Sequence, residues 1–455
     1  MSDSILAYTL DGSSIVLDRE NVVLTSRSKI VERQKCELKA FRQYHGGPTG
    51  TGLQLARPSD DLVLGLAIHA GMETMLRPYI VGETPERGVA ASAAWRYMFD
   101  AAITGLSVQD DENMQHAAPE VAALLIEEQA ALAYMLISAF ERRRLDAVLS
   151  EFQVMEVEDE TNWVLAEPGE TPAGKWIVVM SRPDAILKRK ETGALLPASF
   201  KSLKRWNKEV IRELACDPQR WSEGLAVQAG IGGGVEPEGT FYFHFIKDDR
   251  RMDKDMLVRR YVSPLIRPWA RIEAMGDFRP SDFAMSWEYP SSKTLGMSKL
   301  SHTKWKRVNI WRQLPGGLPK WLEWLDSGMI DQERHPGRDW LAEAVASPEL
   351  QRWDEDLAGG WVQGQIAKEA IWQYQLQLVE REAAKEGISS EEAEPLAFER
   401  RESSCKKWNK FCAYYANCWE HQSLADDVAK GRFIARQPHH EQEYAQVYEE
   451  PESEW

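Results

Sequence analysis

The chain has 455 residues, a formal net charge of −16 and a hydrophobic fraction of 43%. This length allows one large domain or two moderate ones, and the hydrophobic fraction is ordinary for a globular protein. No run of about 18 apolar residues is present, which argues against a membrane span. The N-terminus "MSDSILAYTL" lacks the basic and apolar regions of a signal peptide, so we expect a cytoplasmic protein.

The acidic net charge argues at first against a nucleic-acid partner, but the local charge is different. Residues 182–212 carry nine Lys or Arg against three acidic residues, and "IKDDRRMDKDMLVRRY" forms a second basic cluster. Acidic residues are concentrated in the tail "EQEYAQVYEEPESEW", which is typical of a solvated end. Because a polyanion responds to the local field, the total charge does not exclude DNA.

The first half of the chain predicts helices followed by strands. Residues 59–79 have the spacing of an amphipathic helix with His69 on one face, and helices are expected near 90–105 and 118–149. Short segments rich in branched residues then alternate with turn residues: "FQVMEV", "NWVLAE", "KWIVVM", "PDAILKRK" and "ALLPASFKS". A helix near 218–231 and the strands "GTFYFHFIK" and "LVRRYV" complete a pattern that predicts a mixed sheet flanked by helices.

Four of the five cysteines lie near the two ends of the chain. Cys36 is early, whereas Cys405, Cys412 and Cys418 form a Cys-x6-Cys-x5-Cys pattern after an expected helix over 363–386. Four thiolates can hold zinc or a four-iron cluster. The Cys-x2-Cys pairs typical of zinc sites are absent, which favours iron, with zinc and unligated thiols as the alternatives. Cys216 is expected to lie apart as a small buried hydrophobe.

Two residues in the strand region suit phosphodiester chemistry. Cleaving a phosphodiester needs a hard divalent cation, and Mg²⁺ or Mn²⁺ prefers carboxylate and carbonyl oxygens, with imidazole tolerated by Mn²⁺. A nearby lysine can stabilise developing charge. Asp184 begins one expected strand and Lys201 lies on the next, so antiparallel pairing through the turn "RKETG" would bring them together.

These segments resemble the PD-(D/E)XK nuclease superfamily, in particular its RecB-like exonuclease branch with an iron–sulfur staple. "RPDAI" is similar to the first motif of that family, and "SFK" stands where the family has acid-x-Lys. "GLAIHAGME" resembles the upstream helix, "EGLAVQAGI" the helix after the core, and "SKIVERQKCELKAF" the segment that supplies the first cluster cysteine. The cysteine triplet resembles a viral form of the branch, as in phage. The resemblance covers most of residues 27–265 plus 405–418.

The resemblance implies an α/β fold with a restriction-endonuclease-like mixed sheet flanked by helices, and helical N-terminal and C-terminal additions. It implies a site in which His69, Asp184 and the Phe200 carbonyl hold Mg²⁺ or Mn²⁺, and Lys201 orients the nucleophile. Gln228 would contact DNA or position the lysine. By the same resemblance, a structural [4Fe-4S] cluster would be held by four thiolates: Cys36, Cys405, Cys412 and Cys418.

The implied function is that of a metal-dependent deoxyribonuclease, an exonuclease or flap-type endonuclease in DNA replication, recombination or repair, in a bacterial or phage-infected cell. Single-stranded or frayed DNA is the expected substrate, and a helicase or single-strand-binding protein an expected partner. We divide the chain into five regions on this basis: a helical N-terminal region (1–150), the nuclease core (151–265), a Trp-rich and mainly helical region (266–400), the cysteine segment (401–425) and the acidic tail (426–455).

One residue departs from the family pattern. Ser199 stands where the second motif acid is expected, and a hydroxyl is a much poorer Mg²⁺ ligand than a carboxylate. Three alternatives are open: another acid such as Glu209 or Glu156 takes its place, the strand register shifts, or the chain is an impaired nuclease that serves as a DNA-binding scaffold. The sequence does not choose among them.

Overall fold

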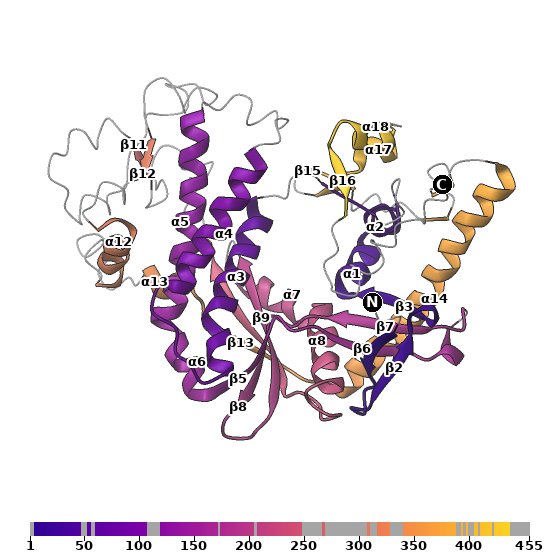
Figure 1. The fold of residues 1–455 in the computed structure, drawn as a ribbon, viewed down its shortest axis with the longest axis horizontal. Coiled ribbons are helices and arrows are strands. Elements are labelled where there is room, and N and C mark those ends of the chain that lie inside the picture. Colours follow the sequence, from indigo (N-terminus) through magenta and orange to yellow (C-terminus); the bar gives the residue numbers. More distant parts are fainter. Residues whose placement is uncertain are drawn as a thin grey trace, which may run out of the picture.

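A computed structural model places most of the chain in defined positions. It describes residues 4–46, 52–55, 60–106, 119–171, 173–203, 207–247, 266–268, 307–309, 316–327, 340–387, 393–394, 397–398, 405–407, 410–420 and 423–436. The expected mixed α/β fold is confirmed, with two five-stranded sheets, each containing parallel and antiparallel pairs and flanked by helices (Figure 1). The strand expected at "LVRRYV", the acidic tail beyond residue 436 and much of the Trp-rich region lie outside the described residues.

The first sheet contains three strands that the sequence patterns did not identify. Its order is β2 (Ser14–Asp18), β1 (Ser4–Tyr8), β6 (Thr161–Ala166), β7 (Trp176–Ser181) and β3 (Val22–Ser26). The N-terminal strands β1 and β2 form an antiparallel hairpin, and β3 runs parallel to β7 on the other edge. The segment before the first expected helix is therefore an integral part of a sheet.

The second sheet carries four of the strands expected in the core, whereas two others, "NWVLAE" and "KWIVVM", lie in the first sheet as β6 and β7. Its order is β13 (Glu349–Arg352), β10 (Gly239–Ile246), β9 (Leu195–Leu203), β8 (Ala185–Arg189) and β5 (Phe152–Val157). The predicted antiparallel pairing of β8 with β9 is confirmed. Strand β10 runs parallel to β9, and the connection between them contains α7 (Lys208–Ala215) and α8 (Pro218–Ala229).

The chain crosses between the two sheets twice, at neighbouring points. It leaves the second sheet after β5 and enters the first at β6, and it returns from β7 to β8. Because β5 pairs with β8 and β6 pairs with β7, the two crossings lie side by side, and the Glu158 N–H donates to the Asp184 carbonyl at 3.2 Å. This double crossing becomes important for the site described below.

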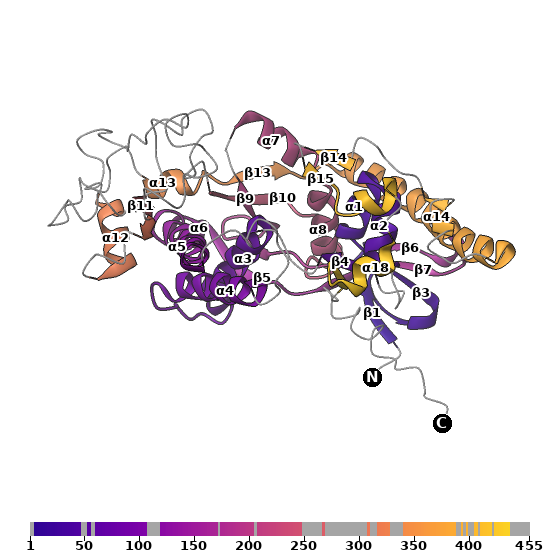
Figure 2. The same cartoon turned by 90° about the horizontal axis from the view of Figure 1, so that it is seen from above.

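Helices cover the sheets and bring distant segments to the crossing. One face of the second sheet packs against α3 (Asp60–Ile80), α4 (Val89–Leu106), α5 (Pro119–Arg143) and α6 (Leu145–Glu151). A Cβ at Gly71 would lie 2.7 Å from Ile137, so this glycine allows α3 to pack closely against α5. Helix α8 lies at the junction of the two sheets and contacts strands of both (Figure 2).

The C-terminal elements pack against the N-terminal helices. Helix α2 (Glu37–Tyr44) shares an apolar cluster with the long helix α14 (Glu355–Glu386), and α1 (Arg27–Lys35) meets α14 through an ion pair between Arg33 and Glu369. The cysteine segment contains β14 (Lys406–Lys407), β15 (Lys410–Phe411) and α17 (Tyr415–Trp419). The remaining elements are η1 (Arg19–Asn21), β4 (Leu53–Leu55), η2 (Pro168–Glu170), β11 (Ile266–Pro268), β12 (Arg307–Asn309), α12 (Gly317–Asp326), α13 (Trp340–Ala344), α18 (Leu424–Ala429) and β16 (Phe433–Ala435). Within the described part of the chain, no helix is both long and apolar enough to cross a membrane.

Candidate functional site

The site is built around Asp184, which lies at the second crossing between the sheets. Residues 182–184 connect β7 to β8, so the Asp184 side chain is placed at the start of a strand rather than within the ladder. The residue is buried, with 6% of its surface exposed. A buried carboxylate must be hydrogen-bonded or paired with a cation, and the contacts of Asp184 are therefore informative.

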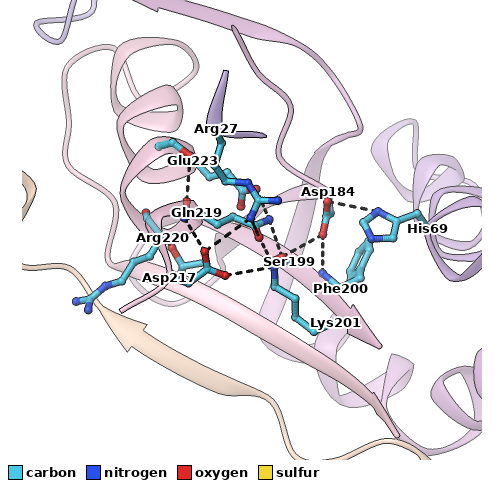
Figure 3. A network of polar contacts seen from close by, with 12 residues as sticks. Arg27, His69, Asp184, Ser199, Phe200, Lys201, Asp217, Gln219, Arg220 and Glu223 are labelled. Atoms are coloured by element: carbon cyan, nitrogen blue, oxygen red, sulfur yellow. Dashed lines mark hydrogen bonds and ion pairs between the residues drawn. The ribbon is translucent and has the colours of Figure 1, made fainter. Parts of the chain in front are cut away.

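The two oxygens of Asp184 face different surroundings (Figure 3). Oδ2 accepts hydrogen bonds from the Phe200 N–H at 2.6 Å and from the Ser199 hydroxyl at 3.2 Å. The last pair of the β8–β9 ladder joins Ala185 to Ala198, so β9 continues past the start of β8 and offers these donors to the carboxylate. Phe200 thus meets Asp184 through its peptide N–H, and Ser199 holds Asp184 in place as a hydrogen-bond donor.

Oδ1 of Asp184 faces an imidazole and a second carboxylate. His69 Nδ1, on α3, lies 3.4 Å from Asp184 Oδ1 and 3.0 Å from Glu158 Oε1. The ligand atoms of these three residues all lie within 4.8 Å of one another. We call this group (His69, Glu158 and Asp184 Oδ1) the cation face, because one imidazole and two carboxylates form a donor set suited to Mn²⁺ or Mg²⁺.

Glu158 reaches the cation face from an unusual backbone conformation. It lies at the first crossing, after β5, and has φ 55°, the only positive φ of a non-glycine residue in the described part of the chain. Left-handed backbone at such a residue costs of order 1–3 kcal/mol and is concentrated at functional sites. The conformation turns the carboxylate toward His69, and Arg182 lies 3.2 Å from its other oxygen.

Electrostatics also mark the cation face as a place for positive charge. Burial disfavours the charged form of His69 most strongly, yet the negative charges of Asp184 and Glu158 outweigh burial and raise the pKa of the imidazole. A positive charge at this position would therefore partly neutralise the two carboxylates. A divalent cation would take over that role, since it binds the neutral imidazole and both acids at once.

Lys201 lies on β9 on the other side of Asp184, where helix α8 begins. Asp217 caps this helix by accepting from the Gln219 N–H at 2.9 Å, and Pro218 occupies the first helical position. The Lys201 ammonium contacts the Gln219 side-chain oxygen and lies 3.5 Å from Asp217 Oδ2. The Gln219 amide nitrogen donates to the Ser199 hydroxyl at 2.9 Å, so a hydrogen-bond chain joins the lysine to Asp184.

A further acid, Glu223, lies one turn after Gln219 on α8 and accepts a hydrogen bond from the Gln219 amide. It is buried, and no hydrogen-bond partner for its Oε2 is present in the described part of the chain. Burial and the neighbouring Asp184 charge raise the pKa of Glu223 to about 8, so this side chain is mostly neutral at pH 7. Gln219 and Glu223 were missed by the sequence analysis, although their i, i+4 spacing places both on one helix face.

Other residues named from the sequence lie away from this group. Gln228 lies nine residues beyond Gln219, about 14 Å along α8, and its amide donates to the Leu10 carbonyl at 3.3 Å. Glu209 is exposed on α7. Glu156 lies on β5, two residues before Glu158, and is not a member of the group at the cation face. Of the residues expected at the site, His69, Asp184, Phe200 and Lys201 are brought together.

Cys36, at the C-terminal end of α1, lies near the segment that contains Cys405, Cys412 and Cys418. Cys36 lies between α1 and α2 and shares an apolar cluster with Cys418, which also packs near Cys412. The β14–β15 hairpin joins Cys405 to Cys412, and the Cys412 N–H donates to the Cys405 carbonyl at 2.8 Å. Burial raises the pKa of the Cys412 thiol, and nearby Cys36 and Cys405 raise it further.

Two N–H donors point at cysteine sulfurs in this region. Arg42 Nη1 lies 3.2 Å from Cys418 Sγ, and Trp419 Nε1 lies 3.3 Å from Cys405 Sγ. Such donors stabilise sulfur that carries negative charge, as a metal-ligating thiolate does. None of the five cysteines forms a disulfide. Cys216 lies apart, as expected, but it is exposed at the C-terminal end of α7, so its interpretation as a buried hydrophobe is wrong.

The chain matches no protein-family model and shows no significant similarity to any curated protein. Its function must therefore be argued from the geometry of the site.

Proposed function

We propose that the chain is a Mg²⁺- or Mn²⁺-dependent deoxyribonuclease of the PD-(D/E)XK type, acting as an exonuclease or flap-type endonuclease. The single observation that carries this proposal is the cation face, in which His69, Glu158 and Asp184 converge within 4.8 Å. Lys201 lies on the next strand, joined to Asp184 through Ser199 and Gln219. Two acids and an imidazole can hold the cation that metal-assisted phosphodiester hydrolysis uses, and an adjacent lysine can stabilise the developing charge.

We infer that Glu158 supplies the second carboxylate that the family pattern would place at position 199. The motif position on β9 offers a hydroxyl that donates to Asp184, and the second carboxylate comes instead from the first crossing. A cation bound here would have two acids, as the chemistry demands, although one of them lies outside the motif. This arrangement favours an active nuclease over a scaffold that only binds DNA.

When bound, the cation supplies Lewis-acid stabilisation of a phosphate oxygen and lowers the pKa of water. The protein supplies the orientation. Hydrogen bonds from Ser199 and Phe200 fix Asp184 Oδ2 and leave Oδ1 directed at the cation face. The contact with the Gln219 oxygen holds the Lys201 ammonium beside the site, where it can orient the nucleophile or stabilise charge on the phosphate.

We further propose that Cys36, Cys405, Cys412 and Cys418 hold a structural [4Fe-4S] cluster. The proximity of these cysteines and the N–H donors at two of their sulfurs support this assignment. The cluster joins residue 36 to a segment near residue 410 and so closes most of the chain into a loop. Protein purified without oxygen should be brown and contain about four irons per chain. Colourless protein with one zinc would contradict the assignment.

Single-stranded or frayed DNA is the proposed substrate, in replication, recombination or repair, and a helicase or single-strand-binding protein the proposed partner. The test of the nuclease is cleavage of labelled single-stranded, double-stranded and flap DNA with Mg²⁺ and with Mn²⁺. Asp184→Asn should reduce cleavage by at least about 10³-fold, because one of the two carboxylates of the cation face is lost. The control is Asp146→Asn, on the exposed surface of α6, which should cleave like wild type. If wild type binds DNA but cleaves none of these substrates with either metal, the scaffold function replaces the nuclease.

A further inference from the structure

The first residue of α1, Arg27, reaches the site from the N-terminal strand segment. Strand β3 runs parallel to β7 with Ser26 opposite Met180, so Arg27 emerges beside the crossing that carries Asp184. Ser26 caps the helix, and Arg33 on the same helix forms a buried ion pair with Glu369 of α14 at 2.5 Å. Arg27 is therefore held on a helix that is anchored at both ends.

Arg27 and Lys201 converge on one neutral oxygen. Arg27 Nη1 and Lys201 Nζ both contact the Gln219 side-chain oxygen (Figure 3), and they lie 3.7 Å and 3.5 Å from the two oxygens of Asp217. We call this group (Arg27, Lys201, Asp217 and the Gln219 amide) the anion face. Two positive charges here are opposed by one carboxylate, because burial keeps Glu223 mostly neutral at pH 7.

Both cations remain accessible. The side chains of Arg27 and Lys201 are 35% and 21% exposed, whereas Gln219, to which they are joined, is buried. A guanidinium carries five N–H donors in a planar fork that matches the oxygens of a phosphate. The anion face lies directly beside the cation face, since Ser199 contacts both Asp184 and Gln219.

We propose that Arg27 binds a phosphate of the DNA strand next to the phosphate held at the cation face, so that the N-terminal segment contributes directly to substrate binding. This inference rests on the proposed function and adds to it a phosphate-binding residue outside the resembling motifs.

The test measures the binding of a labelled single-stranded oligonucleotide in the presence of Ca²⁺. Fluorescence anisotropy gives the affinity at each of several salt concentrations. Arg27→Ala should weaken binding about tenfold and reduce the slope of log affinity against log salt by about 0.7, the value for one phosphate contact on a single strand. Arg27→Lys should keep the slope, because it keeps the charge. The affinity for Mn²⁺ should stay unchanged in both variants.

The matched control is Lys190→Ala, which also removes one positive charge. Lys190 is exposed in the turn after β8, at the opposite end of that strand from Asp184. If Arg27→Ala has the affinity and slope of Lys190→Ala while wild type cleaves DNA, the inference fails and the proposed function stands. If wild type neither binds nor cleaves DNA, both fail. If Arg27→Ala melts at a lower temperature than wild type, its weaker binding could come from lost structure, and Arg27→Lys then provides the test. A reduced salt slope in Arg27→Lys, which keeps the charge, would overturn the inference.

Discussion

The two sides of Asp184 differ in charge, in origin and in the way the chain builds them. The cation face combines two carboxylates with an imidazole, and its acids come from the two points at which the chain crosses between the sheets. The anion face combines a lysine of β9 with an arginine of the N-terminal segment, joined through a glutamine of α8. We propose the first side as the site for a metal and the second as the site for a phosphate.

The comparison shows that one uncharged residue, Ser199, can connect the cation face and the anion face and still keep their charges apart. Ser199 donates to Asp184 on one side and accepts from Gln219 on the other, so it connects the faces without adding charge to either. A negatively charged side chain at this position would repel the carboxylates of the cation face and attract the two cations of the anion face. The two faces would then no longer be electrostatically separate. Variants that change one face should therefore leave the other largely intact, and the following predictions exploit that separation.

The largest effect is expected from the acid that does not belong to the family motif. Glu158→Gln should lower the affinity for Mn²⁺ by about 10- to 100-fold, because one of two anionic ligands is lost. Binding of DNA in Ca²⁺-free buffer should change little, since the anion face is untouched. Isothermal titration with Mn²⁺ provides the measurement. The matched control is Glu156→Gln, two residues earlier on β5, and equal affinities for the two variants would remove Glu158 from the site.

Loss of the cysteine site should destabilise the fold and weaken the anion face more than the cation face. Cys412→Ser should release the segment that follows α1, lower the melting temperature by about 5 °C or more, and weaken DNA binding about tenfold through Arg27. Cys216→Ser is the control, because that cysteine lies apart on α7. Calorimetry and anisotropy measure the two effects. Equal melting temperatures for the two variants would show that the four cysteines do not join the ends of the chain.

A smaller effect is expected from adding the acid that the family motif would predict. Ser199→Asp removes a donor to Asp184 Oδ2 and places a second negative charge within about 3 Å of it, so we expect cleavage to fall about tenfold. Ser199→Ala, which removes the donor without adding charge, should cost less. Cleavage rates in Mg²⁺ distinguish the cases. Faster cleavage by Ser199→Asp would mean that Glu158 does not replace the motif acid.

The sequence predicted the parts of this site that depend on local patterns. The β8–β9 hairpin followed from strand and turn signals, and it brings Asp184 close to the strand of Lys201. Glu158 could not be predicted in the same way, because a register shift in β5 and a left-handed residue direct its side chain. The sequence analysis named Glu156 and Glu209 as replacement acids instead.

The residues of the anion face were missed for a different reason. Arg27 approaches only because β3 joins the far sheet beside β7, a pairing between segments about 150 residues apart that no local pattern specifies. Gln219 could have been predicted from the sequence, since it shares a helix face with Glu223. Gln228 was chosen instead because the segment "EGLAVQAGI" resembles the family helix. Long-range pairing thus limits what spacing and propensity alone can predict.

The smallest predicted effect concerns the interior behind Lys201. Burial, with a contribution from the Lys201 charge, lowers the pKa of His244 to about 4, whereas the unfolded value is about 6.5. The unfolded chain therefore binds protons more readily between these values, and stability is lost as the pH falls from about 6.5 toward 4, by about 1 kcal/mol at pH 5.5. Urea unfolding at pH 7.5 and 5.5 should show a smaller pH effect in His244→Gln. An unchanged pH effect would contradict a neutral buried His244.

The central claim is that a divalent cation binds where His69, Glu158 and Asp184 converge. Pulsed electron paramagnetic resonance of bound Mn²⁺ tests this directly, because it detects the nitrogen of a coordinated imidazole. Wild type should show one imidazole nitrogen, and His69→Gln should lose it while still folding. A nitrogen signal that persists in His69→Gln, or its absence from wild type with Mn²⁺ bound, would contradict the account.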